Sequence, residues 1–338
     1  MILGTRGSQL ALFQAHAVAT LLHERTGRAC EIAVIKTSGD RLADATLAQI
    51  GGKRLFVKEI EDALLQGAID LAVHSSKDMP AQLPDGLVIG AVLPREDPRD
   101  AVVLPAYVGR VPRGETSDQA PPSGPADGDA RLDEIIHQLG DTPRIGTSSV
   151  RRTAQLSMLL PTARFGPIRG NLDTRLRRLD AGEFDALVLA AAGLRRLGHG
   201  SRISAALPPG ACVPAPGQGI IAVEIRSDNA NMRGIVDTIG DRVAASALAA
   251  ERTVVTRLGG GCQMPIGAYA AVSGGNLSLS AIVLSLDGRR SARAEASGPL
   301  ADAERIGTRA ADRLLAEGAA DILAGVERAR AAVDGLQP

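Results

Sequence analysis

The feature that most constrains the fold is an alternation of strand-like and helix-like patterns along most of the chain. Short apolar runs alternate with segments of helical spacing, and the first such segment is capped by Ser8 and closed by Gly27. Strands separated by helices need crossover connections, which favour largely parallel sheets covered by helices. The pattern therefore predicts an α/β fold. The expected strands are 1–5, 31–36, 69–73, 87–93, 144–146, 163–168, 186–189 and 220–225.

The pattern also predicts how the chain is divided. A charged, proline-broken stretch at 94–100 is typical of a hinge. From about residue 242 the pattern changes to one long helix, two strand-like runs at 268–272 and 277–286, and Ala-rich helices, which indicates a small α+β unit. Residues 109–130 are rich in Gly, Pro, Ser and Asp and predict a mobile surface insertion. The expected domains are 1–98 with 219–238, 99–214, and 242–338.

Composition narrows the class of protein. The 38 basic residues balance 38 acidic ones, and there are four Phe, two Tyr and no Trp, so neither counterion release nor base stacking favours a nucleic-acid partner. No apolar run reaches the ~20 residues of a membrane span, and the first residues do not resemble a signal peptide. Three cysteines, Cys30, Cys212 and Cys262, are too few for a disulfide framework. We expect a cytoplasmic protein without a membrane or nucleic-acid partner.

A first candidate site follows the predicted strand 69–73. His74, Ser75, Lys77 and Asp78 then lie at the carboxyl end of that strand, where open α/β sheets bind ligands. Lys77 and Asp78 are either an ordinary solvated ion pair or a functional pair, in which the carboxylate stabilises a developing cation and the ammonium faces an anion. His74 is either a base or a structural histidine.

Arginines recur where other predicted strands end. Thr147, Ser148 and Ser149 open a helix whose first turn carries two arginines, which predicts either an anion site or a helix cap with surface arginines. The same arrangement recurs after strand 163–168, where a glycine and a capping Asn precede a further helix. We infer a single cleft lined by guanidiniums and suited to a ligand with several carboxylates. The residues concerned are Arg6, Arg151, Arg152, Arg169, Gly170, Asn171, Arg175, Arg195 and Arg196.

Cys262 is the cysteine whose sequence context most favours a functional role. It follows three glycines, which predict an open loop, whereas Cys30 and Cys212 have the apolar surroundings of structural cysteines. It is either incidental or a nucleophile or attachment point presented to the cleft. No His/Asp partner or second cysteine lies near it in the sequence, so we expect no metal site.

Taken together in this order, the motifs resemble the porphobilinogen deaminases, also called hydroxymethylbilane synthases, of tetrapyrrole (heme) biosynthesis. The resemblance covers nearly the whole chain outside 109–130. Its motifs are Thr5–Leu12, Ile35–Asp40, Gly52–Glu59, His74–Pro80, Gly146–Arg152, Arg169–Asn171, Pro216–Gly219 and Gly260–Gln263.

The resemblance implies a monomeric three-domain transferase: two lobes like type II periplasmic binding proteins, with mixed, largely parallel sheets, and a small C-terminal α+β domain. It implies a dipyrromethane cofactor joined by a thioether to Cys262, on which four porphobilinogens are condensed with loss of ammonia before hydroxymethylbilane is hydrolysed off. Asp78 matches the family's catalytic aspartate. The remaining matches are cofactor and substrate contacts: Arg6, Ser8, Lys53, Ser75, Lys77, Thr147, Ser148, Ser149, Arg151, Arg152, Arg169, Gly170, Asn171, Arg175, Arg196 and Gln218.

Two other functions are compatible with parts of the pattern. A non-catalytic, two-lobed solute-binding protein explains the arginines and the hinge, but neither Cys262 nor the C-terminal unit. An enzyme with a phosphate-bearing cofactor would need a phosphate-binding glycine motif, and the sequence contains no such motif.

Overall fold

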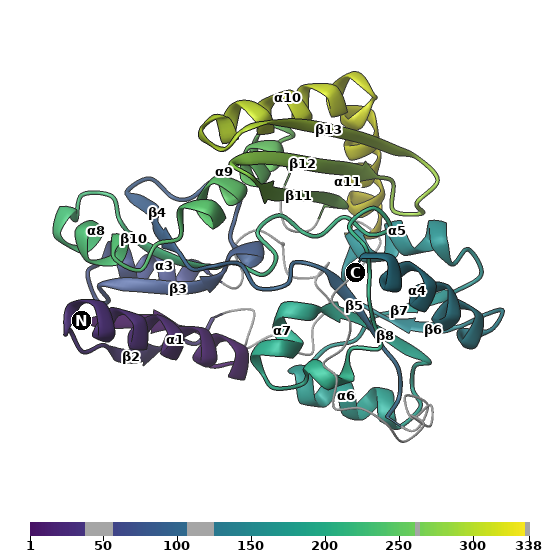
Figure 1. Ribbon diagram of the computed structural model, residues 1–338, viewed down its shortest axis with the longest axis horizontal. Coiled ribbons are helices and arrows are strands. Elements are labelled where there is room, and N and C mark those ends of the chain that lie inside the picture. The colour runs from purple at the N-terminus through teal and green to yellow at the C-terminus, as the bar shows by residue number, and fades with distance from the viewer. Residues whose placement is uncertain (38–56, 107–124, 261–263, 335–338) are drawn as a thin grey trace.

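The computed structural model describes residues 1–37, 57–106, 125–260 and 264–334, which form three sheets and the helices that cover them. Figure 1 shows the first two sheets side by side and the third sheet above both. The α/β fold class predicted above is confirmed, and the smaller C-terminal unit carries its own sheet and helices. The predicted domain ranges stay a prediction.

The first sheet has the strand order β2-β1-β3-β10-β4. β1 pairs in parallel with β2 and β3, whereas β10 runs antiparallel to β3 and β4. The helices of this lobe within the described residues are α1, α3 and α8, and β3 leads into the short 3-10 helix η1. The bounds are β1 (Ile2–Thr5), α1 (Gln9–Thr26), β2 (Glu31–Val34), α3 (Lys58–Leu65), β3 (Leu71–Ser75), η1 (Ser76–Asp78), β4 (Leu87–Val92), β10 (Ile221–Arg226) and α8 (Ala230–Asp237).

The second sheet has the order β7-β6-β8-β5-β9. β6 pairs in parallel with β7 and β8, and β5 runs antiparallel to β8 and β9. Both lobes thus have the predicted mixed sheets. The bounds are β5 (Asp100–Val103), α4 (Pro125–Leu139), β6 (Arg144–Gly146), α5 (Val150–Leu159), β7 (Arg164–Gly166), α6 (Leu172–Asp180), β8 (Ala186–Ala190), α7 (Ala191–Arg196), η2 (Gly200–Arg202) and β9 (Ala205–Ala206).

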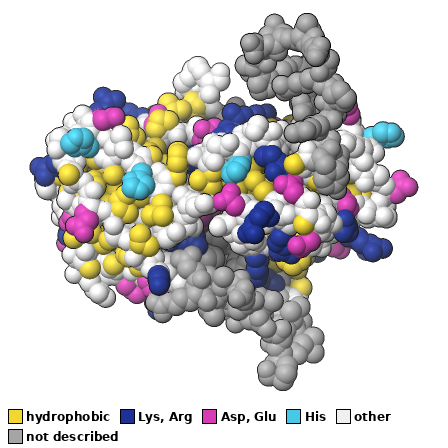
Figure 2. Space-filling view, turned by 90° about the horizontal axis from the view of Figure 1, so that it is seen from below, with side chains coloured by type: hydrophobic (Ala, Val, Ile, Leu, Met, Phe, Trp, Pro, Cys, Tyr) yellow, Lys and Arg dark blue, Asp and Glu magenta, His cyan; other side chains and the backbone are white. Residues whose placement is uncertain are grey.

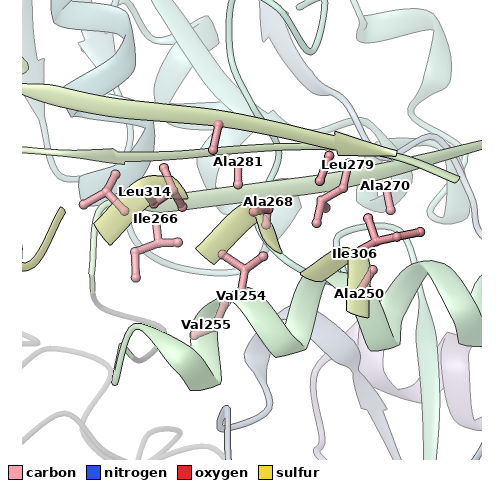
Figure 3. Packing of buried hydrophobic residues seen from close by; sticks show 14 of the residues in the cluster. Ala250, Val254, Val255, Ile266, Ala268, Ala270, Leu279, Ala281, Ile306 and Leu314 are labelled. Atoms are coloured by element: carbon pink, nitrogen blue, oxygen red, sulfur yellow. The ribbon is translucent and has the colours of Figure 1, made fainter. Parts of the chain in front are cut away.

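The third sheet, β11-β12-β13, is antiparallel, and its buried face packs on α9, α10 and α11. Figure 3 shows this core, in which Val254 of α9 and Ile306 of α10 meet the alanines of the sheet. α9 also packs on the first lobe through Ala244 and Leu248, so one helix joins the two units. The bounds are α9 (Arg242–Arg257), β11 (Ile266–Ser273), β12 (Asn276–Leu284), β13 (Ser291–Pro299), η3 (Leu300–Asp302), α10 (Ala303–Ala316) and α11 (Ala319–Asp334).

Three expectations are corrected. Strand β13 was not predicted, because alanines occupy its inward positions and give little apolar contrast. The predicted hinge includes Asp100, but this residue begins strand β5 and is fully buried. The predicted insertion extends to residue 130, whereas helix α4 already begins at Pro125; residues 109–124 lie outside the described part.

The chain passes twice between the first and second lobes, once between β4 and β5 and once between β9 and β10. The two passages lie side by side, since Glu96 N–H donates to the Gly219 carbonyl over 3.1 Å. Gly219 has a φ of +88°, and a Cβ there would lie 2.3 Å from the Glu96 carbonyl oxygen. Glycine is therefore required where the two passages touch.

Candidate functional site

A cavity of about 260 Å³ lies where the first and second lobes meet. The carboxyl ends of β1, β3 and β8 reach it, as does the segment that leads into β10. Figure 2, which views the molecule from below, shows Lys and Arg side chains on both halves of that face, with more of them on the right-hand half. The predicted site residues that line the cavity are Arg6, Ser8, Ser75, Lys77, Arg152, Gly170, Asn171, Arg175 and Arg196.

The charged side chains in the described lining of this cavity are all positive. Its described lining includes four arginines and Lys77 but no Asp or Glu. Burial lowers the pKa of Arg175, and the nearby charge of Arg152 lowers it further, although Asp78 acts in the opposite direction. Burial also lowers the pKa of Arg196. Crowded cations in a partly dry cavity are stabilised by an anion, so the cavity is suited to carboxylates.

Two helix N-termini add to the positive electrostatic potential in the larger cavity. Ser8 caps α1 by accepting a hydrogen bond from Ala11 N–H over 3.3 Å, and Asn171 caps α6 by accepting from Thr174 N–H over 2.9 Å. Both caps line the cavity, so the positive ends of both helix dipoles lie there. Gly170 precedes the second cap with a φ of +96°.

Some arginines are held in place by backbone carbonyls. Arg175 Nε donates to the Gly170 carbonyl over 2.9 Å, and Arg196 Nη2 donates to the Gly219 carbonyl over 2.7 Å. A guanidinium has five N–H donors, so these bonds orient the group and leave other donors for a ligand. Arg196, on the second lobe, thereby bonds to the segment returning to the first lobe.

Lys77 and Asp78 form the last two residues of η1. Asp78 is exposed and is absent from the lining of the cavity, but its charge acts on the pKa of both Lys77 and Arg175. Burial lowers the pKa of Lys77 to about 8, and the charge of Arg152 adds to that effect against the opposing charge of Asp78. Burial thus distinguishes Lys77 from the lysine of an ordinary solvated ion pair, although Asp78 is exposed.

A second cavity of about 80 Å³ lies where both lobes and the C-terminal unit meet. Its lining includes residues of η1, of α5 and its N-cap, and of the C-terminal unit: Ser76, Lys77, Ser149, Arg151, Arg252, Met264 and Ile266. Among the described residues, the buried Ser76 hydroxyl and Arg151 Nε have no hydrogen-bond partner. Unpaired buried donors are costly, so a polar ligand group that reached them would be stabilising.

Behind the cavities, Asp100 is fully buried among polar groups. It accepts from Arg151 Nη1 at 2.7 Å, from Arg152 Nε at 2.8 Å and from Gln218 Nε2 at 2.9 Å. Burial raises the pKa of Asp100, but the charges of Arg151 and Arg152 outweigh this and hold it well below its ordinary value. Cys212 also lies 3.3 Å from this carboxylate, and burial together with that charge raises its pKa to about 12.

The remaining predicted site residues line neither cavity or lie outside the described residues. Thr147 is buried and accepts from Ser149 N–H, and the Ser148 hydroxyl donates to the Ile168 carbonyl over 2.7 Å. Gln218 lies behind the cavity, where its Nε2 donates hydrogen bonds to the Pro98 carbonyl and to the Asp100 carboxylate. Arg169 is partly buried and lines neither cavity. Lys53 and Cys262 lie outside the described residues.

His74 also takes no part in the cavities. It is buried, with Nε2 3.0 Å from a carboxylate oxygen of Glu224 in the neighbouring strand β10. It thus has the contacts expected of a structural histidine.

Sequence reasoning missed several residues that shape the site. Gln14 lines the larger cavity and exchanges hydrogen bonds with Ser75 over 2.8 Å and 3.2 Å. Its signal was a polar residue four positions before Val18 on the buried face of α1. Arg95 and Glu251 were missed because no local pattern indicates that a residue after β4 pairs with one in α9.

Comparison with known proteins bears on this arrangement. Residues 1–234 match the family model "Porphobilinogen deaminase, dipyromethane cofactor binding domain", and residues 245–316 match "Porphobilinogen deaminase, C-terminal domain". The chain belongs to the porphobilinogen deaminase family. The resemblance inferred from the motifs is thereby confirmed, and with it a fold that binds a dipyrromethane cofactor.

Relatives of this family match almost end to end. The porphobilinogen deaminase of Geotalea daltonii is 42% identical over 325 residues, covering 96% of this chain and 94% of that protein. That of Desulforudis audaxviator is 45% identical over 327 residues, covering 96% and 97%. Among solved structures, immunogenic lipoprotein A from Vibrio vulnificus is similar with a TM-score of 0.38 and 14% identity, covering 74% of this chain and 99% of that one.

The described residues fit the family's cofactor. A dipyrromethane carries several carboxylates, and the described linings of the two adjoining cavities contain Lys77 and arginines but no Asp or Glu. Met264, two positions after Cys262, lines the smaller cavity. Among the residues that can be described, no cluster suits a metal ion, and no helix there is long and apolar enough to cross a membrane.

Proposed function

We propose that this chain condenses four porphobilinogen molecules head to tail, releases one ammonia for each, and frees hydroxymethylbilane by hydrolysis. The observation that supports this most strongly is the cavity between the lobes, with five cationic side chains and no acidic one in its described lining. Porphobilinogen carries an acetate and a propionate on each ring, so a growing chain accumulates carboxylates. Arginines stay charged at all working pH values and can hold them by paired hydrogen bonds.

We further propose that the dipyrromethane cofactor is joined by a thioether to Cys262. When bound, this group supplies the ring at which chain growth begins. Ser76, Lys77, Ser149 and Arg151, which line the smaller cavity, are the residues that would hold it. The position of Met264 in the same lining supports attachment two residues earlier.

Asp78 is the proposed catalytic carboxylate. It stands on a short helix at the end of β3, next to Lys77 and within electrostatic reach of Arg175. Loss of ammonia leaves positive charge on the substrate, and a fixed carboxylate stabilises that charge and can accept a hydrogen bond from the pyrrole N–H.

The test is the intact mass of the denatured protein, measured before and after adding porphobilinogen. The wild-type chain should carry the mass of two porphobilinogen units less their ammonia, and the substrate should add increments of one ring. The Cys262→Ala variant should carry neither. An unmodified mass for an active wild-type preparation overturns the attachment, and absence of ammonia release from porphobilinogen overturns the proposed activity.

A further inference from the structure

Gln155 is a buried polar residue of α5 that lines neither cavity. Its side-chain amide is paired with both backbone groups of Val213: Nε2 donates to the Val213 carbonyl over 3.1 Å, and Oε1 accepts from the Val213 N–H over 2.7 Å. Arg151, one helical turn earlier, donates from Nη1 to the same carbonyl over 2.6 Å. Two buried side chains of α5 thus fix Val213 relative to this helix.

Val213 belongs to the return segment, residues 207–220, which connects β9 to β10. The C-terminal unit is docked on this segment, since the Ala268 N–H of β11 donates to the Pro214 carbonyl over 3.0 Å. A Cβ at Gly267 would lie 2.8 Å from the Val213 carbonyl oxygen, so the two backbones touch there. A buried apolar cluster joins α5, the return segment and β12 at the same place. The residue that Gln155 holds is therefore the one on which β11 rests.

The same elements form opposite sides of the smaller cavity. Arg151 of α5 lines it from the second lobe, and Ile266, the first residue of β11, lines it from the C-terminal unit. Ala215 of the return segment lies in the lining as well. Cys262, the proposed attachment point, precedes Ile266 by four positions in the sequence. The separation of the arginine side from the C-terminal side of this cavity thus depends on the segment that Gln155 holds.

We propose that Gln155 is a positioning residue: by holding Val213, it sets the distance between the arginines of α5 and the C-terminal unit that bears the cofactor. The proposal rests on the proposed function, because it concerns how that cofactor is placed. Gln155 acts through the return segment and touches no substrate. Its effect on the reaction follows from geometry, because a misplacement of reacting groups by about 1 Å costs roughly 100-fold in rate.

The first experiment separates this role from substrate binding. Gln155→Met keeps the length of the side chain but removes both hydrogen bonds to Val213. We expect kcat, expressed per chain that carries the cofactor mass, to fall by about 10-fold or more. KM should change less than about 3-fold, because Arg175 and Arg196, which line the larger cavity, are oriented by other carbonyls.

The matched control is Ser204→Ala, in the same lobe but outside both cavities. It removes the hydroxyl that accepts from the buried Leu104 N–H over 3.0 Å, much as Gln155→Met removes the acceptor of the Val213 N–H. Both variants should lower the free energy of unfolding, but Ser204→Ala should leave kcat unchanged. A merely structural role of Gln155 predicts the same kinetics for both variants.

The second experiment does not depend on turnover. Hydrogen exchange of backbone amides is measured on the cofactor-bearing wild type and both variants. In Gln155→Met, the Ala268 N–H that binds the Pro214 carbonyl should exchange at least about 10-fold faster than in wild type. In Ser204→Ala it should exchange as in wild type. The amides paired between β12 and β13 should be unchanged in all three proteins, which shows that the C-terminal unit itself is intact.

If Gln155→Met yields no folded protein, Gly267→Ala decides, because its Cβ pushes β11 away from the Val213 carbonyl while Gln155 stays in place. The same loss of kcat is expected, and Gly210→Ala, where a Cβ meets open space, is its control.

The proposal is overturned by wild-type kcat per loaded chain in the deciding variant, by wild-type exchange at Ala268 in Gln155→Met, or by an equal loss of kcat in Ser204→Ala. Ammonia release by the wild-type chain is measured in parallel, so failure of the proposed function is recognised separately.

Discussion

At the scale of single residues, the site depends on charges that the fold holds apart from water. Arg151 is 4% exposed and its Nη1 is shared between Asp100 and the Val213 carbonyl. Arg152 bonds to the same carboxylate and also reaches the larger cavity. Asp100 thus fixes two arginines that the sequence indicated only as ligand contacts. Truncating one member of such a cluster leaves an uncompensated buried charge.

Asp100→Asn should therefore destabilise the protein by about 3–5 kcal/mol, because two buried guanidiniums lose their counter-charge. The measurement is the free energy of unfolding in urea across acidic pH. The wild-type carboxylate has a lowered pKa in the folded state, so its stabilising contribution is present above the unfolded value of about 3.9 and is lost as the pH falls below it.

The Asn variant should lack that part of the pH dependence. Asp85→Asn, at an exposed position before β4, is the control and should change the free energy by less than about 0.5 kcal/mol. Equal stability of Asp100→Asn and wild type would show that the buried carboxylate does not hold the arginines.

Asp78→Asn should nearly abolish turnover while the cofactor mass stays attached, because the amide keeps the size of the carboxylate but cannot stabilise positive charge. The measurements are ammonia release and the intact mass of the same preparation. Since Asp78 is exposed, the free energy of unfolding should change little. Near wild-type turnover in this variant would remove Asp78 from the mechanism.

At the scale of elements, strand ends and helix starts place the ligand-binding groups. The carboxyl ends of β1, β3 and β8 meet at the cavity, and the N-termini of α1 and α6 point to it. The return segment before β10 completes this arrangement, because Gly219 lets it touch the outgoing passage at Glu96. The glycine at this position is thus a requirement of the crossing.

Gly219→Ala tests the crossing of the two passages. We expect a loss of more than about 1 kcal/mol in the free energy of unfolding, since the φ of +88° is unfavourable for alanine and its Cβ would contact the Glu96 carbonyl. Turnover should fall as well, because the same carbonyl of residue 219 orients Arg196. Gly182→Ala, with a φ of +79° and open space around it, is the control that isolates the backbone effect.

At the scale of the whole molecule, one ion pair joins the passage between the lobes to the C-terminal unit. Arg95 binds the fully buried Glu251 of α9 through both Nη atoms, and its guanidinium lies 5.0 Å from the ring centre of Tyr269. Glu251 also accepts from the N–H groups of Gly217 and Ala270 at 2.7 Å each. The unit that carries Cys262 is therefore attached to the passage where the lobes join.

Arg95→Met should cost about 3–5 kcal/mol in the free energy of unfolding, because it leaves the Glu251 carboxylate buried without a counter-charge. Adding Glu251→Met should recover part of that loss. Arg257→Met breaks the exposed pair with Asp312 and should cost at most about 1 kcal/mol. If Arg95→Met behaves like this surface control, the pair does not hold the C-terminal unit in place.

The sequence by itself determined the elements and the class of ligand. Its apolar spacing and caps located α1, β3, α5 and α6, and its motifs placed Arg6, Arg175 and Arg196 at strand and helix ends. Both signals are local, because capping and periodicity depend on residues a few positions apart.

Only the tertiary structure decided which of these groups face the cavities and which support them. Arg151 and Arg152 are neighbours in sequence, yet one lies behind the larger cavity and the other lines it, since their side chains leave α5 in different directions. The partners Asp100 and Gln218, and likewise Arg95 and Glu251, are more than a hundred residues apart. Such contacts follow from how lobes pack on one another, and no local pattern in the chain specifies them.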